Sequence, residues 1–102
     1  LGRMVNPNIV RQQVESSVIF GLSAALYGEI TLKDGRIEQT NFDKYPVVRM
    51  PDAPTVETHL VASTENPGGI GEPATALISP TVANAVFAAT GKRLRKLPLR
   101  LA

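Results

Sequence analysis

The residues best suited to chemistry in this 102-residue chain are a lone glutamate and the glycines before it, in the sequence GGIGEP at 68–73. Gly69 and Gly71 carry no Cβ, so the main chain can turn sharply there and approach another group closely. Pro73 fixes its own φ and favours an extended conformation for Glu72. This arrangement would hold a carboxylate on a shaped corner, where it could act as a general base. The same pattern is also typical of an ordinary surface turn.

Other kinds of site have less support in the sequence. A phosphate-binding loop at 67–72 would lack the lysine and the Ser/Thr of a P-loop, and the spacing of a dinucleotide fingerprint. The chain has no cysteine and a single histidine, which argues against thiolate and histidine metal sites, so we assign no metal ligand. His59 alternates with Glu57 in an extended pattern. We interpret it as a half-exposed strand histidine beside a carboxylate rather than as a ligand or proton carrier.

Length and composition indicate a single domain, placed at 1–102. Hydrophobic residues make up 43% of the chain, which is enough for a core. No apolar run approaches the roughly 20 residues of a membrane span, and we expect no membrane partner. The net charge is +2, but five of the eleven cations lie in 92–100 without any acid. The chain begins Leu-Gly-Arg, so we expect a processed product or a piece of a longer protein, of unassigned compartment.

Two amphipathic helices are expected to position the glutamate. Asn6 can cap and Pro7 can open a helix over 7–27, in which apolar residues recur every four positions. Its small residues would let another backbone come close; they are Ser16, Ser17, Gly21, Ser23 and Ala24. A second helix is expected to start after Ser79, with Pro80 at its first position, and to end at a glycine, Gly91.

The remaining segments predict a small, mostly antiparallel sheet. Asp-Gly at 34–35 lies between alternating segments, which predicts a β-hairpin with Leu32 opposite Ile37. Residues 56–61 alternate as a strand, and 97–101 could form an edge strand. The apolar, proline-interrupted segment 41–55 is expected to pack against protein outside this chain. The predicted fold class is therefore α+β, with two amphipathic helices packed on a small, mostly antiparallel sheet that includes a β-hairpin.

Three blocks of this sequence, in this order and spacing, resemble a known family over nearly the whole chain. They are GRMVNP at 2–7 leading to QVE at 13–15, GGIGEP at 68–73, and PTVANAVFAATGKR at 80–93 ending in LPL at 97–99. The family is that of the molybdopterin-binding large subunits of xanthine dehydrogenases and aldehyde oxidoreductases. The isoquinoline 1-oxidoreductase β-subunit type is the most similar, and this chain corresponds to its C-terminal part.

The resemblance implies that Glu72 is the general base in a molybdenum-dependent hydroxylation of an N-heterocycle or aldehyde. An exposed carboxylate is a weak base at neutral pH, so this role requires burial against apolar groups, which favours the protonated form. Gln13 matches a glutamine that hydrogen-bonds the pterin, although an ordinary surface amide is an equal alternative. Gly71 matches a position where the main chain comes near the metal site.

The same resemblance implies the molecules around this chain. The cofactor would be molybdopterin with molybdenum, held in the full-length enzyme and not by this piece alone, which we expect to be inactive. The partners would be the remainder of the large subunit, an iron–sulfur small subunit and a small-molecule substrate. Neither the substrate nor the electron acceptor follows from these residues.

Two alternatives from other classes remain open at the level of sequence. The first is a non-enzymatic interaction domain whose basic tail binds nucleic acid or another acidic partner, through Lys92, Arg93, Arg95, Lys96 and Arg100. Aromatic residues are only 5% and no recognition-helix motif is present, so we disfavour nucleic acid. The second is a structural module in which the glycine loop is only a turn.

Overall fold

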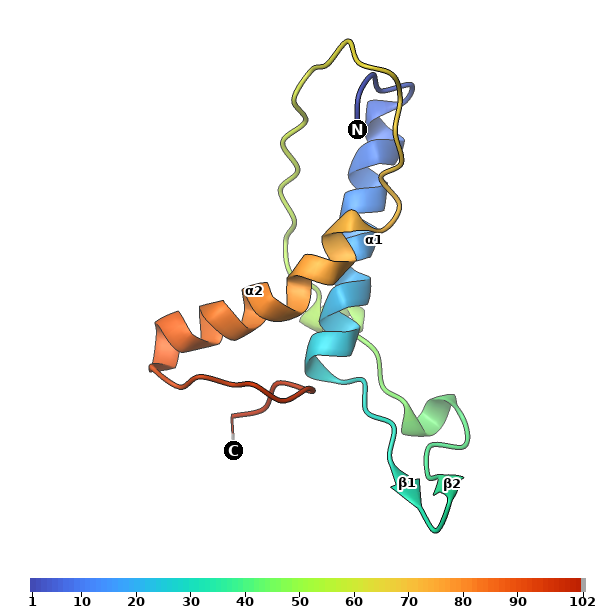
Figure 1. The fold of residues 1–102 in the computed structure, drawn as a ribbon, viewed down its shortest axis with the longest axis vertical. Coiled ribbons are helices and arrows are strands. Elements are labelled where there is room, and N and C mark those ends of the chain that lie inside the picture. The colour runs from blue at the N-terminus through green and yellow to red at the C-terminus, as the bar shows by residue number, and fades with distance from the viewer. Residues whose placement is uncertain (102) are drawn as a thin grey trace.

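A computed structural model describes residues 1–101 of the chain (Figure 1). It contains two helices, a two-stranded antiparallel sheet and two short 3₁₀ turns, which confirms the α+β class. In chain order the elements are α1 (Pro7–Leu26), β1 (Leu32–Lys33), β2 (Arg36–Ile37), the 3₁₀ turns η1 (Phe42–Lys44) and η2 (Met50–Asp52), and α2 (Pro73–Thr90).

Helix α1 begins where its capping residue predicts. The Asn6 side chain accepts hydrogen bonds from the main-chain N–H groups of Asn8 and Ile9 at 3.1 and 3.2 Å, and Pro7 occupies the first turn. The helix ends at Leu26, one residue before the predicted end. Apart from Val10, the buried positions of α1 carry small side chains, namely Ser17, Gly21 and Ala25. The small-residue face, spaced every four residues, is therefore the face that packs.

Helix α2 begins seven residues before the predicted start, so the assignment of Ser79 and Pro80 to a helix N-terminus is wrong. Pro73 occupies the first turn, and Pro80 lies inside the helix, where it can donate no hydrogen bond to the preceding turn. Packing on α1 offsets this cost, because the residues before Pro80 hold the contact between the helices. Gly91 ends the helix as predicted, with φ 71° and its N–H bonded to the Phe87 carbonyl at 2.8 Å.

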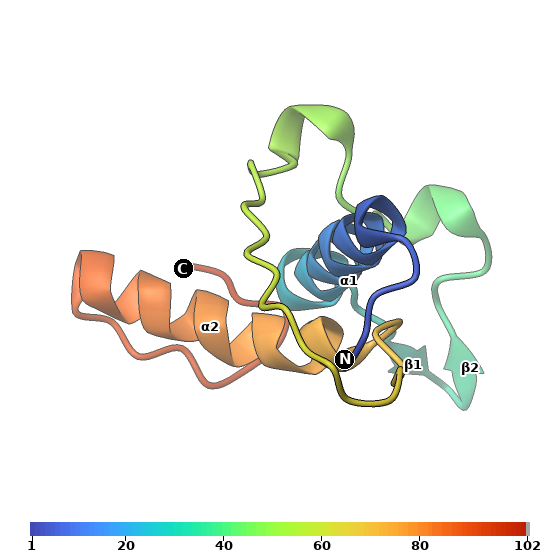
Figure 2. The ribbon, with the colours of Figure 1, turned by 90° about the horizontal axis from the view of Figure 1, so that it is seen from above.

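The two helices cross at a glycine. A Cβ built on Gly21 would lie 2.6 Å from the Cβ of Ile78 and 3.0 Å from the Thr75 carbonyl oxygen, so only glycine allows this approach. The predicted close contact along the small face of α1 is thus present. Figures 1 and 2 show α2 crossing α1 through its first turns and then extending beyond it.

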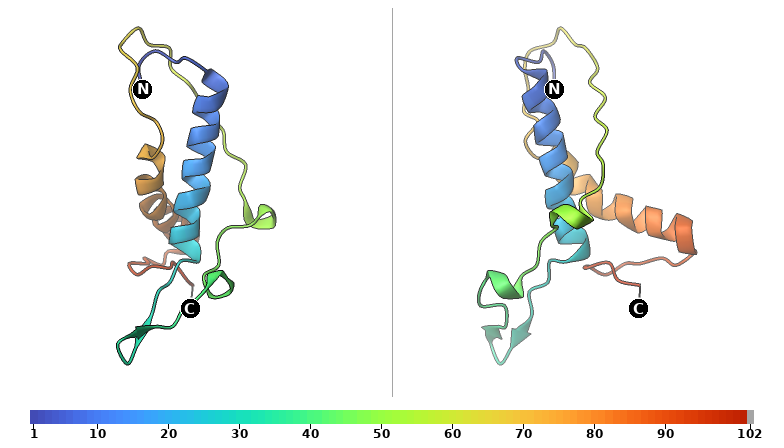
Figure 3. Two further views of the ribbon diagram at one scale, coloured as in Figure 1. Left: turned by 90° about the vertical axis from the view of Figure 1, so that its right-hand side faces the viewer. Right: turned by 180° about the vertical axis from the view of Figure 1, so that it is seen from behind.

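The hairpin forms as predicted but stands apart from the helices. Asp34 and Gly35 have φ values of 50° and 76°, and Leu32 pairs with Ile37. Within residues 1–101 the helices pack on each other and neither contacts the strands, so packing of both helices on the sheet is not observed (Figure 3). A two-residue ribbon whose apolar side chains are exposed offers too little surface for a helix to cover.

The other two predicted strands do not form. Residues 56–61 are extended, but no strand lies beside them in the part of the chain that the structure describes. Residues 97–101 are irregular: Leu99 is buried, and its N–H donates to the Ala25 carbonyl at the end of α1, at 2.7 Å. A strand needs a partner for its ladder, and in both cases residues 1–101 supply none.

The molecule is extended and has little core. Its radius of gyration is 16.7 Å, whereas a compact chain of this length would have about 13 Å. Its accessible surface is 7903 Å², against about 5,600 Å² for a compact monomer. Large apolar side chains are exposed, including Phe42 at 90% and Met50 at 87% in the segment 41–55. Neither helix in residues 1–101 is both long and apolar enough to span a bilayer.

Candidate functional site

Glu72 lies at the junction of the glycine loop and α2, in the N-cap position of that helix. Its side chain makes no capping hydrogen bond, so the carboxylate does not stabilise the N-terminus of the helix through such a bond. It lines a pocket of about 430 Å³ together with Gly71, Thr75 and three residues of α1, namely Ser16, Ser17 and Phe20. Glu72 is exposed, and no residue in 1–101 supplies the burial that the base role requires.

Two hydrogen bonds fix the loop that carries Glu72 to the middle of α1. The Ser17 hydroxyl, on a residue only 3% exposed, donates to the Gly71 carbonyl at 2.7 Å. The Thr75 hydroxyl donates to the Ser17 carbonyl at 3.2 Å. One bond lies just before Glu72 and the other just after it, so the main chain on both sides of the carboxylate is tied to the same turn of α1.

The sequence did not single out Ser17 beyond its small size. Its hydroxyl bonds to a residue 54 positions away, and no local motif signals a contact of that range. In a helix interior a serine more often bonds to its own helix, as Ser23 does to the Ile19 carbonyl at 3.2 Å. The fold alone reveals that Ser17 holds the glycine loop.

The other two predicted site residues lie near this junction in different ways. Gly71 lines the pocket, and a Cβ built on it would meet nothing within 4 Å, so its outer side is open. Gln13 lies one turn before Ser17 on the same side of α1, because residues four apart share a helix face. The Gln13 side chain is exposed and makes no hydrogen bond within residues 1–101. It is not among the residues that line the Glu72 pocket.

A second hollow of about 570 Å³ adjoins the Glu72 pocket and is strongly apolar. The two share Ser16 and Phe20, and the second is lined further by Ile19, Ser23, Ala24, Phe42, Tyr45, Val47 and Val48. Phe20 stands between them and is 73% exposed. The carboxylate therefore has an apolar wall next to it, which the sequence did not predict because helix α1 and segment 41–55 meet only in the fold.

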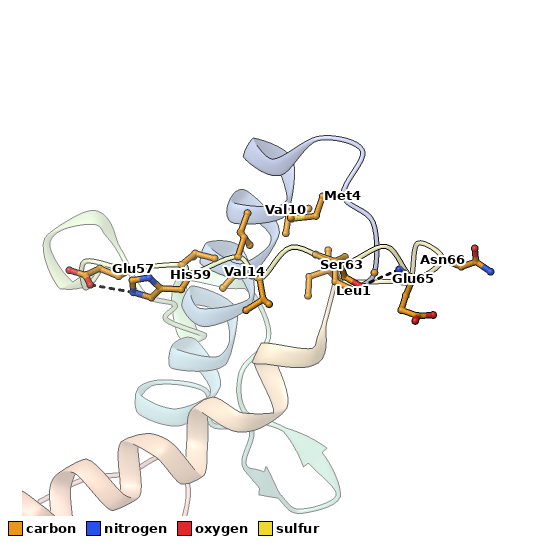
Figure 4. Close-up of a pocket in the computed structure, with 15 residues that line it drawn as sticks. Leu1, Met4, Val10, Val14, Glu57, His59, Ser63, Glu65 and Asn66 are labelled. Atoms are coloured by element: carbon orange, nitrogen blue, oxygen red, sulfur yellow. Dashed lines mark hydrogen bonds and ion pairs between the residues drawn. The ribbon is translucent and has the colours of Figure 1, made fainter.

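A third hollow, of about 780 Å³, lies elsewhere and does not include Glu72. It separates the first half of α1, at Val10 and Val14, from the extended segment around His59 (Figure 4). Nε2 of His59 is 3.8 Å from Oε2 of Glu57, and both side chains are largely exposed. The expected neighbouring carboxylate is present, but His59 is largely exposed rather than half-exposed, and it lies in no strand. No group of three His, Cys, Asp or Glu side chains in residues 1–101 could hold a metal ion.

The basic tail is partly committed to contacts within the chain. The Arg93 guanidinium lies 3.8 Å from the ring centroid of Phe87, and its Nη1 donates to Oδ1 of Asn84 at 2.7 Å. Nη2 of Arg100 is 3.0 Å from Oε2 of Glu29. These contacts account for two of the five tail cations and weaken the case for a nucleic-acid-binding domain.

Replacing Ser17 by alanine is expected to loosen the Glu72 loop without unfolding α1. The Gly71 carbonyl would lose its donor, at a cost of about 1 kcal/mol, because this exposed group can still bond to water. Amide hydrogen exchange of residues 75–78, in the first two turns of α2, should accelerate roughly five-fold. Ser16→Ala is the matched control, since that hydroxyl bonds only to the Gln13 carbonyl within α1. Equal exchange in the two variants would show that the Ser17 hydroxyl does not hold the Glu72 loop.

Known proteins match this chain in sequence and in fold. The family described as the molybdopterin cofactor-binding domain matches residues 1–54. The chain is 36% identical over 99 residues to a membrane-bound aldehyde dehydrogenase [pyrroloquinoline-quinone] of Gluconacetobacter polyoxogenes, covering 97% of this chain and 13% of that protein. It is 35% identical over 100 residues to isoquinoline 1-oxidoreductase subunit beta of Brevundimonas diminuta, with 98% and 13% covered.

A solved structure shares the fold. The crystal structure of the Cu,Mo-CO dehydrogenase in its carbon monoxide reduced state superposes with a TM-score of 0.76 at 23% identity, over 88% of this chain and 12% of that one. This chain thus spans about an eighth of the length of each of these three proteins. It belongs to the molybdopterin cofactor-binding domain family, as its resemblance to the molybdopterin-binding subunits of the xanthine dehydrogenase family predicts.

Proposed function

We propose that this chain forms one wall of the molybdenum cofactor site in the catalytic subunit of a molybdenum hydroxylase, with Glu72 as the general base. The proposal rests on how the Glu72 carboxylate is held and on what surrounds it. It caps nothing, it is held by a loop tied to α1 on both sides, and it lines a pocket beside an apolar wall. A surface turn needs none of these features.

The residues present fit a molybdopterin cofactor. Gly71 leaves open space where a side chain would stand, so a flat cofactor could approach its main chain. The Gln13 side chain, free of partners within residues 1–101, offers the donor and acceptor that a pterin edge requires. When bound, that cofactor would supply the redox chemistry.

The chain's own residues would handle the proton and the substrate. Glu72 would accept a proton during the attack on an electrophilic carbon, and Ser17 would hold the loop so that the carboxylate faces the reacting groups. Phe20 would provide an apolar surface for the substrate and keep water from the carboxylate. Removal of water strengthens a carboxylate as a base, and the cofactor and the rest of the subunit would complete this enclosure.

The remainder of the enzyme is part of the same proposal. The relatives are about eight times as long as this chain, and its excess surface supports placement inside a larger subunit. Two relatives carry aldehyde and isoquinoline in their names, which supports an aldehyde or an N-heterocycle as the substrate class. An iron–sulfur small subunit would receive the electrons, and 1–102 would be a single domain at the C-terminal part of the large subunit.

The test is metal analysis of the purified full-length protein together with turnover. We expect about one molybdenum per subunit and reduction of an artificial electron acceptor by N-heterocycles or aldehydes. Because one relative is named for pyrroloquinoline quinone, the same sample should be assayed for quinone. A quinone-loaded protein without molybdenum, or a molybdenum-loaded protein inert toward both substrate classes, would contradict the proposal.

A further inference from the structure

Residues 55–62 have the side-chain pattern of a β-strand. Val56, Thr58 and Leu60 are half-buried, whereas the alternate residues 57, 59 and 61 are exposed. The segment runs beside the first half of α1 (Figures 1 and 3), and its residues 57–61 line the same hollow as Val10 and Val14. An alternation of this kind is typical of a strand with one face on a core and one face outward.

The main chain of this segment has no hydrogen-bond partners within residues 1–101. No N–H or C=O group of residues 54–63 bonds to another main-chain or side-chain group there. The first bonds beyond it involve the carbonyls of Thr64 and Glu65. A ten-residue run of this kind is unusual in a folded protein, because most main-chain groups are paired.

A buried polar atom in the segment also lacks a partner. The Thr58 hydroxyl oxygen has less than 1 Å² of accessible surface and no hydrogen bond, and it is the only side-chain atom of this kind in residues 1–101. A buried hydroxyl without a partner costs free energy, which a water or a group from outside these residues would offset. The unpaired hydroxyl and the unpaired main chain lie in the same segment.

We propose that residues 55–62 form a β-strand that pairs edge-on with a strand from the remainder of the same large subunit. The proposal rests on the proposed placement of this chain within such a subunit. The relatives extend over about eight times this length, which provides a covalently linked partner at high local concentration. The fold places the segment along an open side of α1, where a neighbouring strand could continue it into a sheet.

Hydrogen exchange on the purified full-length subunit tests this pairing. We expect the paired amides in 55–62 to exchange at least 100-fold more slowly than amides of the same sequence in an unstructured peptide. Pairing at one edge would protect alternate residues, and pairing at both edges would protect all of them. Exchange at the rate of the unstructured peptide throughout 55–62 would overturn the proposal. Protection that disappears on dilution would assign the partner to a second copy and overturn it equally.

Two matched pairs of variants separate main-chain pairing from side-chain packing. His59→Pro and Thr58→Pro each remove one N–H, on opposite edges of the segment, whereas His59→Ala and Thr58→Ala keep it. At least one proline variant should accelerate exchange of the remaining protected amides ten-fold or more beyond its alanine control. No difference in either pair would contradict the strand.

Metal analysis of the same samples separates this inference from the proposed function. Molybdenum present with the segment unprotected would reject the strand alone, and a protected segment without molybdenum would reject the enzyme assignment alone.

Discussion

Replacing Glu72 by glutamine in the full-length subunit is expected to lower kcat by about 10²- to 10⁴-fold while the bound molybdenum stays unchanged. Glutamine keeps the size and shape of the side chain but cannot accept a proton at this position. The side chain caps no helix and makes no hydrogen bond within residues 1–101, so its replacement removes no structural contact of this chain. Steady-state turnover and metal content of the same preparation are the measurements.

A neighbouring acid provides the control for this experiment. Glu65 lies ahead of the glycine loop, is exposed and does not line the Glu72 pocket. Glu65→Gln should therefore leave kcat within about two-fold of the wild type, since surface substitutions away from special features have small effects. Near-normal turnover of Glu72→Gln would instead show that the loop is scaffolding, which is the structural alternative left open by the sequence.

The second large effect is expected from Gly21→Ala, which should weaken the crossing of α1 and α2. The new Cβ would lie 2.6 Å from the Cβ of Ile78, so the helices must move apart. Overpacking of this kind costs roughly 1–3 kcal/mol, which corresponds to a 5- to 150-fold acceleration of amide exchange in the first turns of α2. Helix propensity alone predicts the opposite sign, because alanine favours a helix by about 1 kcal/mol over glycine.

Gly69→Ala is the matched control for that experiment. A Cβ at Gly69 would meet no atom within 4 Å, and its φ is not in the left-handed region. Exchange in α2 should remain near the wild-type value. If Gly21→Ala were as mild as Gly69→Ala, the close crossing would not be what positions the Glu72 loop.

The features that the sequence predicted well are those set by neighbouring residues. Asn6 caps α1 through N–H groups two and three positions away, and Gly91 ends α2 with a left-handed φ. Asp34 and Gly35 both adopt the positive φ that a tight hairpin turn requires. Each signal acts within one turn of chain, so no knowledge of the tertiary structure is needed.

The failures all involve contacts between distant parts of the chain. Pro80 suggested a helix start, but packing of the preceding turns on α1 extends α2 back to Pro73. The alternation at 56–61 correctly predicted which side chains are half-buried and which are exposed. It did not predict that residues 1–101 contain no partner strand for this segment. The candidate site shows the same division: a local motif pointed to Glu72 as a candidate, whereas the bond from Ser17 to the glycine loop depends on the packing of α2 on α1, and the apolar wall at Phe20 depends on the meeting of α1 with segment 41–55.

The central claim is that Glu72 faces the reacting groups of a molybdenum site, and a structure of the full-length subunit with its cofactor and a substrate analogue tests it most directly. The account predicts a Glu72 carboxylate oxygen within hydrogen-bond reach, about 2.6–3.2 Å, of the cofactor or the analogue. It also predicts that Ser17 still donates to the Gly71 carbonyl. A carboxylate that points into bulk solvent, with the cofactor bound on another side of the chain, would contradict it.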